Sequence, residues 1–335
     1  MTDNNLESIV SPAQFITDPG KPVLSVLDNL CCYQVSGEDA STFLQGQFSN
    51  DINEVSENKA QITSYSTAKG RMLAIFYVCK QSDHYLLITS ADIAEDVMKR
   101  LQMYVMRSKV TISKLEDHTL IGLSNDIDAS VLNHLSLTQP GSDYQTSMAG
   151  DTLCVKVPGV NLRYMLIGGQ TLLEQCQQLS KNEVEIYANE YWQWLDILAG
   201  LPMITAATQE AFVPQMANME LINGVSFSKG CYPGQEVVAR LHYLGNANRR
   251  MFRVKTDANQ ALNAGDEIYS SASDQAIGKF VTTVNIGDNK IDALAILRVE
   301  TSKSKSLSTS KENNNSVEIM ELPYAVPTEP KEKKS

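Results

Sequence analysis

The sequence predicts an α+β protein in which two α+β domains precede a small C-terminal β-barrel. Its 335 residues, 43% of them hydrophobic, are enough to bury two or three cores. Two successive segments show the order strand, helix, strand, strand, helix, which is typical of paired α+β domains with antiparallel sheets. After residue 250 the apolar runs are short and separated by Gly, Asn and Asp turns, as in a small barrel.

The two α+β segments are read from their hydrophobic periodicity. Period-two runs predict strands, and apolar spacings of three to four residues predict helices. The first segment has expected strands at 30–35, 60–66, 72–79, 85–89 and 109–113, a helix opened by Ser36 and Asp39, and a helix at 91–105. The second has expected strands at 118–124, 152–157 and 164–169 and helices at 128–135 and 171–179.

A short apolar helix at 190–199, stopped by Gly200 and Pro202, connects to the last third of the chain. The barrel strands are expected at 251–255, 267–271, 276–284 and 291–299. A low-complexity segment at 301–316 predicts a mobile loop, and 317–322 predicts one more strand after it.

Composition excludes several classes of protein. The apolar stretches fall far short of the ~18 residues that a membrane span needs, and the N-terminus lacks the pattern of a secretory or transit signal, so we expect a cytoplasmic protein. Six cysteines without CxxC spacing fit neither a disulfide framework nor a zinc or iron–sulfur ligand set. We therefore expect reduced thiols and no bound metal.

A net charge of −11 argues against non-specific coating of nucleic acid. The segment 229–255 is an exception, because it contains six basic residues and one acid, Glu236. An anion-binding patch and an ordinary solvated face are both compatible with that count. The basic residues are Lys229, Arg240, Arg249, Arg250, Arg253 and Lys255.

The densest local motif is FSKGCYPGQEVVAR at 227–240. Pro233 and Gly234 suit the central positions of a type II turn, and a helix-compatible run follows at once. Cys231 therefore lies just before a helix N-terminus and two residues from Lys229, and both features favour a thiolate. A small buried cysteine is the alternative. His242 is a distant candidate base and, more simply, a surface histidine.

KGCYPGQEVVAR resembles the signature of the YgfZ-type folate-binding proteins, which are relatives of the glycine-cleavage aminomethyltransferase. The segments LQGQFSNDI (44–52), AKGRM (68–72), AGLP (199–202) and FVPQMAN (212–218) extend the resemblance in the same order. It implies a three-domain ring with tetrahydrofolate, or another folate derivative, in its central hole. It also implies a role in assembling or repairing iron–sulfur clusters and, through them, in methylthiolation of some tRNAs.

The resemblance also implies which residues matter. Its functional pair is Cys231 and Lys229, within a motif that includes Tyr232, Gly234, Gln235 and Glu236. Folate contacts are expected at Trp192, at Arg240 and at Leu30, which stands where some relatives have a tryptophan. The expected partners are folate, iron–sulfur enzymes or their assembly factors and, indirectly, tRNA, with no membrane.

The domain boundaries that accompany this resemblance interleave along the chain. The expected parts are a flexible leader at 1–22, a first α+β domain from 23–48 with 115–182, a second from 49–114 with 183–248 that carries the motif, a barrel at 249–325 with its mobile loop at 301–316, and a tail at 326–335.

Three departures from the relatives matter: the first argues against aminomethyl transfer, and the other two are expected to weaken folate affinity. Leu73 and Ala74 stand where the aminomethyltransferases carry paired aspartates, and a methyl group cannot take a proton. Leu198 stands where a glutamate pairs with the pterin, and Leu30 replaces the tryptophan. We therefore expect folate binding without classical aminomethyl transfer. A folate-dependent one-carbon transferase, and an RNA- or protein-binding scaffold with a vestigial folate site, are the alternatives.

Overall fold

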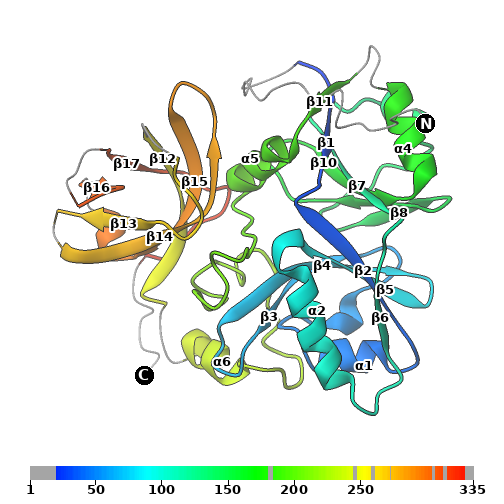
Figure 1. Cartoon of the computed structure of the whole chain (residues 1–335), viewed down its shortest axis with the longest axis horizontal. Coiled ribbons are helices and arrows are strands. Elements are labelled where there is room, and N and C mark those ends of the chain that lie inside the picture. The colour runs from blue at the N-terminus through cyan, green and yellow to red at the C-terminus, as the bar shows by residue number, and fades with distance from the viewer. Residues whose placement is uncertain are drawn as a thin grey trace. The chain divides into compact units, whose positions relative to one another are not determined.

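The computed structural model describes residues 20–179, 184–243, 247–257, 261–271, 273–303, 306–311 and 315–328. Residues 1–19 of the expected leader (1–22) and residues 329–335 of the expected tail (326–335) lie outside the described residues. Strands and helices alternate through the first two thirds, and strands dominate the last third (Figure 1). The expected α+β class, with a barrel-like sheet at its C-terminal end, is confirmed.

The first sheet has six strands in the order β11-β1-β7-β10-β9-β8. Only the β1–β11 pair among these described strands is parallel. One core cluster joins the sheet to its helices through Ile121, Leu166, Val131 and Cys176. The elements are β1 (Val23–Val26), β7 (Thr119–Ser124), α3 (Ala129–His134), β8 (Thr146–Ala149), β9 (Thr152–Lys156), β10 (Arg163–Gly168), α4 (Gln170–Leu179) and β11 (Glu185–Tyr187).

The second sheet has five strands in the order β3-β4-β5-β2-β6, so the expected meander at 60–89 is confirmed. Along β4 eight consecutive residues are buried, which explains a run that is apolar throughout instead of alternating. The elements are β2 (Leu30–Ser36), α1 (Ala40–Gln45), the 3-10 helix η2 (Ile52–Glu54), β3 (Gln61–Ser66), β4 (Met72–Gln81), β5 (His84–Ser90), α2 (Ala91–Val105) and β6 (Thr111–Lys114).

The position of β2 differs from the expected grouping of 23–48 with 115–182. Tyr33 pairs with Leu87 of β5 and Lys114 of β6, whereas Leu24 of β1 pairs with Leu123 of β7. Two strands separated by a three-residue turn thus join different sheets. The reason is that β-pairing is decided by distant partners, which the local pattern does not contain.

The third sheet has the order β16-β13-β14-β15-β12-β17, and a bridge from Ser308 to Ser316 links its two ends. This almost closes a barrel around a core that includes Phe252, Phe280 and Leu297. The elements are β12 (Arg249–Asp257), β13 (Glu267–Ser270), β14 (Ser273–Asn285), β15 (Lys290–Arg298), the 3-10 helix η3 (Thr301–Lys303), β16 (Leu307–Ser308) and β17 (Val317–Met320).

Within the segment expected to be a mobile loop, the structure describes η3 and β16, while 304–305 and 312–314 lie outside the described residues. The strand expected after it is β17. Before the barrel come α5 (Asn189–Ala199), an irregular stretch at 200–234 and α6 (Gln235–Tyr243).

The chain divides into two compact units. Unit 1 comprises 1–40, 53–61 and 77–195, and unit 2 comprises 41–52, 62–76 and 196–335. Unit 2 contains the KGCYPGQE motif and the barrel. Unit 1 contains Trp192 and Leu30.

Candidate functional site

The motif of unit 2 forms an irregular loop, 227–234, that leads directly into α6. Gly234 has φ = 83°, and Tyr232 O accepts a bond of 3.3 Å from Gln235 N. This matches the type II turn expected for Pro233-Gly234, whose second central residue needs φ near +80°. Gln235 Oε1 also accepts from Tyr232 N at 3.3 Å, so the first helical side chain caps its own turn.

A second glycine turn packs directly against this one. The turn between β3 and β4 is closed by a 2.8 Å bond from Gly70 N to Thr67 O, and Gly70 has φ = 72°. A Cβ added to Gly234 would lie 2.6 Å from both Gly70 Cα and Thr67 O. Such distances are possible only because neither glycine has a side chain. AKGRM and KGCYPGQE are therefore the two halves of one backbone contact.

The LQGQFSNDI segment forms the other wall of the loop. Ser49 Oγ, fully buried, donates to Gly224 O at 2.8 Å and accepts from Ser64 N at 2.9 Å. Asn50 Nδ2 donates to Asn223 O at 2.7 Å. The chain just before the motif is thus fixed by two short polar side chains. Neither residue was predicted from the sequence to have a role, although a Ser-Asn pair after a helix is a detectable signal for turn hydrogen bonding.

Lys229 projects from the loop onto the end of α1. Its Nζ donates to Gln45 O at 2.5 Å and to Phe48 O at 2.6 Å, and it lies 5.0 Å from the centroid of the Tyr232 ring. Carbonyls at a helix C-terminus favour a cation. Burial lowers the pKa of Lys229 to about 8, and the Asp51 carboxylate opposes part of that shift. Lys229 therefore pins the loop to 44–52.

Cys231 points into solvent from this fixed loop. All six cysteines lie in the described part of the chain, and Cys231 is the exposed one. Burial raises the pKa of each of Cys79, Cys154 and Cys176 to about 12. The alternative of a small buried cysteine does not describe Cys231. Its expected thiolate character stays a prediction.

Aromatic side chains gather where α6 ends. The rings of Phe227 and His242 stack with centroids 3.6 Å apart, and Tyr243 meets His242 edge-on at 4.8 Å. His242 is thus engaged in ring packing, in line with the simpler of its two interpretations. Arg240 and Glu236 of the same helix are exposed.

The basic segment 229–255 has fewer unpaired charges than its count of basic residues indicated. Arg250 forms an ion pair with Glu220 in which both side chains are nearly buried. Arg253 meets the buried Asp292 through two bonds, of 3.0 and 2.6 Å. Both acids lie outside the counted window, so the tertiary fold neutralises charges that the sequence presents as unpaired.

Trp192 lies in unit 1 and is 2% exposed. A Cβ at Gly122 would lie 2.2 Å from its ring, and the Arg163 guanidinium carbon lies 4.8 Å from the ring centroid. The indole as it stands offers no open face for a pteridine. Leu30, at the start of β2, is 8% exposed. The folate roles of Trp192, Leu30 and Arg240 stay predictions.

The apolar residues that stand where relatives carry carboxylates are buried or half-buried in the structure. Leu73 and Ala74 are 5% and 0% exposed, inside β4. Leu198 is half-buried in α5. No group of three or more His, Cys, Asp or Glu side chains in the described ranges is arranged to hold a metal ion.

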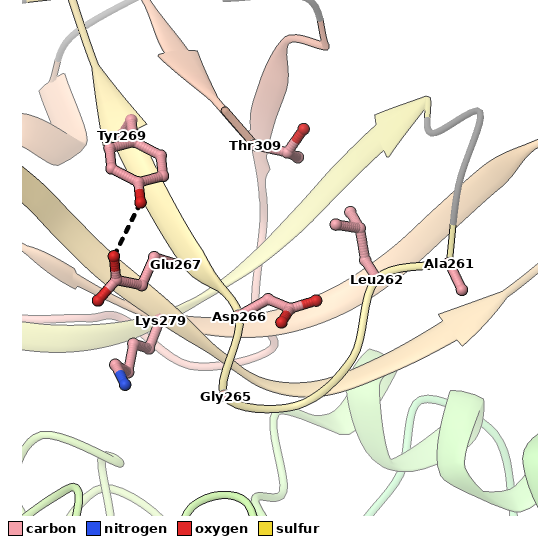
Figure 2. Close-up of a pocket in the computed structure, with 8 residues that line it drawn as sticks. All are labelled: Ala261, Leu262, Gly265, Asp266, Glu267, Tyr269, Lys279 and Thr309. Carbon is pink, nitrogen blue, oxygen red and sulfur yellow. Dashed lines mark hydrogen bonds between the residues drawn. The ribbon is translucent and has the colours of Figure 1, made fainter. Parts of the chain in front are cut away.

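A pocket of about 470 Å³ opens in the barrel between the loop at 261–265 and β13 (Figure 2). Asp266, Glu267 and Lys279 line it, and Tyr269 donates to Glu267 at 2.8 Å. Ligand pockets are usually lined by apolar and aromatic side chains, and this one is mostly polar. None of the residues expected at the functional site borders it.

No family model matches the chain. It is 32% identical over 234 residues to the tRNA-modifying protein YgfZ of Colwellia psychrerythraea, covering 70% of this chain and 72% of that protein. The chain belongs to the YgfZ family. The YgfZ protein of an Escherichia coli O6:H1 strain is 25% identical over 305 residues, covering 90% and 93% of the two chains.

Among solved structures, the glycine cleavage system aminomethyltransferase T of Bartonella henselae matches with a TM-score of 0.74 and 15% identity. The match covers 90% of this chain and 86% of that one. This YgfZ-family chain therefore has the aminomethyltransferase fold, as the sequence resemblance implied. None of the described helices is long and apolar enough to cross a membrane.

Proposed function

We propose that this chain is a folate-binding protein that assists the assembly or repair of iron–sulfur clusters and thereby the methylthiolation of some tRNAs. The observation that carries the proposal is the exposed thiol of Cys231 on a loop whose surroundings are fixed. Glycine contacts, Ser49, Asn50 and Lys229 hold the backbone, and none of those bonds involves the thiol. An exposed thiol on a fixed loop is the kind of group that a client protein or its cluster can contact.

Two similarities support the proposal. Relatives across most of the chain are named tRNA-modifying proteins. The fold is that of an aminomethyltransferase. When bound, folate would supply a pteridine and an anionic glutamate tail, with Trp192, Leu30 and Arg240 as the expected contacts. A pteridine stacks on Trp192 only after the Arg163 side chain has left the ring.

A one-carbon transferase is the competing hypothesis, and it needs a carboxylate where this chain has Leu73 and Ala74. Both side chains are buried and apolar, so no proton acceptor exists at that place. Release of ammonia from an aminomethyl carrier, stimulated by the protein and tetrahydrofolate, would overturn our preference for an assistance factor.

Complementation tests the proposed role. A strain that lacks its YgfZ protein should regain methylthiolated tRNA with the parent chain and not with Cys231→Ala. Cys31→Ala is the matched control, because Cys31 is only half-buried and belongs to unit 1, whereas the motif belongs to unit 2. If both variants restored methylthiolated tRNA equally well, Cys231 would not be required for the function.

Folate binding is tested separately by equilibrium dialysis with tetrahydrofolate. Trp192→Phe should weaken binding several-fold, since it shrinks the aromatic face but keeps a ring in the core. If the parent chain binds no tetrahydrofolate while Cys231 is still needed for tRNA methylthiolation, the chain is a thiol-dependent factor whose folate site is vestigial.

A further inference from the structure

Strand β12 carries three arginines that differ in how the protein neutralises them. Arg250 and Arg253 each have a carboxylate partner, in Glu220 and Asp292. Among the described residues, Arg249 has no hydrogen bond or ion pair from its side chain. Its directly opposite residue on β15 is Arg298, which likewise has no such partner within the described ranges. Like charges directly opposite in a sheet are destabilising.

A third guanidinium, that of Arg71, acts on Arg249 through its charge. Arg71 follows Gly70 in the turn that packs on the Cys231 loop, and its Nη1 donates to Ala211 O at 2.5 Å. Burial first, and then the charges of Arg298 and Arg71, lower the pKa of Arg249. All three arginines belong to unit 2 and are half-buried. Their mutual repulsion is therefore only partly screened by water.

We propose that Arg71, Arg249 and Arg298 form a binding site for a phosphate group. A guanidinium has five N–H donors and always carries its charge. Arg71 uses one of these donors on Ala211, and most donors of the three side chains are available. A carboxylate offers about four acceptor sites, which one or two arginines already satisfy. A phosphate dianion carries more charge and more oxygens, and so suits three.

This site goes beyond the proposed function, because it needs neither folate nor an iron–sulfur client. It also explains why two arginines of β12 are paired internally and the third is not: the counter-charge of Arg249 comes from a ligand. The phosphate comes either from a small phosphorylated compound, whose terminal group is the dianion argued above, or from the backbone of an RNA, whose successive diesters each carry one charge. Both sources present anionic phosphate oxygens to the arginines.

The test is a titration of the full chain with pyrophosphate at constant ionic strength, followed by calorimetry. The parent should bind saturably, and Arg249→Gln and Arg298→Gln should each weaken binding about tenfold or more. Lys290→Gln is the matched control, because it removes one exposed positive charge from the same strand as Arg298. It should bind as the parent does.

A second readout separates a ligand site from a structural role. Without phosphate, Arg298→Gln should unfold at the same temperature as the parent or higher, because it removes like-charge repulsion. With phosphate, only the parent and Lys290→Gln should gain thermal stability. Competition by a short RNA would identify nucleic acid as the source of the phosphate, and its absence would favour a small compound.

Three results would overturn the site. The first is a parent chain that shows no saturable pyrophosphate binding. The second is a Lys290→Gln variant that loses as much affinity as Arg298→Gln, because the binding would then come from diffuse charge. Stronger competition by oligo-γ-glutamate than by pyrophosphate would show that the site prefers carboxylates.

Discussion

The surroundings of Trp192 and of Cys231 are built in opposite ways, although sequence analysis expected function at both. The Trp192 indole is held by side-chain packing, with Gly122 against its ring and Arg163 over it. The Cys231 loop is held through its backbone, and its thiol is exposed. A residue fixed by packing cannot change without a cost in stability, whereas a side chain on a loop fixed by backbone contacts can be used for chemistry.

The largest loss of stability should come from removing the buried side chain of Trp192. Trp192→Ala should lower the free energy of unfolding by about 3–5 kcal/mol, because it removes a large buried side chain and leaves a cavity. Urea denaturation, with Trp192→Phe as the milder control, measures this cost. A Trp192→Ala protein as stable as the parent would mean that the indole is not part of the core, and the contrast between the two regions would fail.

The next largest effect should come from the loop backbone. Gly234→Ala should lower the free energy of unfolding by about 2–4 kcal/mol, since it combines a positive φ with a Cβ only 2.6 Å from Gly70 Cα. Gly230→Ala is the matched control in the same loop. A Cβ there meets nothing within 4 Å. Equal losses in the two variants would show that the glycine contact does not hold the loop.

Lys229 should make stability depend on pH. Its pKa is about 8 in the folded protein and about 10.4 in an unfolded chain, so the unfolded state binds more protons between these values. The free energy of unfolding of the parent, relative to Lys229→Met, should therefore rise as the pH increases from about 8 to about 10. Because Lys229 is only partly buried, we expect a rise of about 1 kcal/mol.

Chemical denaturation across that pH range checks the Lys229 prediction. A difference between parent and Lys229→Met that stays constant would show that the amino group titrates normally in the folded state. It would also mean that the carbonyls of Gln45 and Phe48 stabilise the charge as well as water does.

The smallest effect on stability should come from the thiol itself. Cys231→Ser should change the free energy of unfolding by no more than about 0.5 kcal/mol, because the side chain is exposed. In the native parent, mass spectrometry should find Cys231 alkylated first, and Cys79, Cys154 and Cys176 only after unfolding. Slower alkylation of Cys231 in Lys229→Met would show that the lysine also favours the thiolate.

Local sequence patterns predicted many of the elements, and three motifs that the structure brings together were visible in the sequence. The Pro233-Gly234 turn and the helix after it followed from local chemistry alone. Local patterns do not show which distant strand or side chain a residue will pair with. The separation of β1 from β2, and the carboxylates opposite Arg250 and Arg253, depend on residues far away in the chain.

The candidate site shows the same limit. The sequence identified Cys231 and Lys229 as a pair, and the structure shows that Lys229 reaches the end of α1 while Cys231 faces solvent. The motif LQGQFSNDI was informative only as a likeness to relatives. Its physical role became clear when Ser49 and Asn50 were found holding the chain ahead of the loop.

The contact between Gly70 and Gly234 has a consequence for how the protein matures. The hairpin that carries Gly70 leaves the ribosome long before Gly234 does, and closing so long a chain segment is entropically costly. The loop around Cys231 can therefore take its final shape only late in folding, when both turns are present. The exposed position of the Cys231 thiol is therefore fixed only in chains that have finished folding.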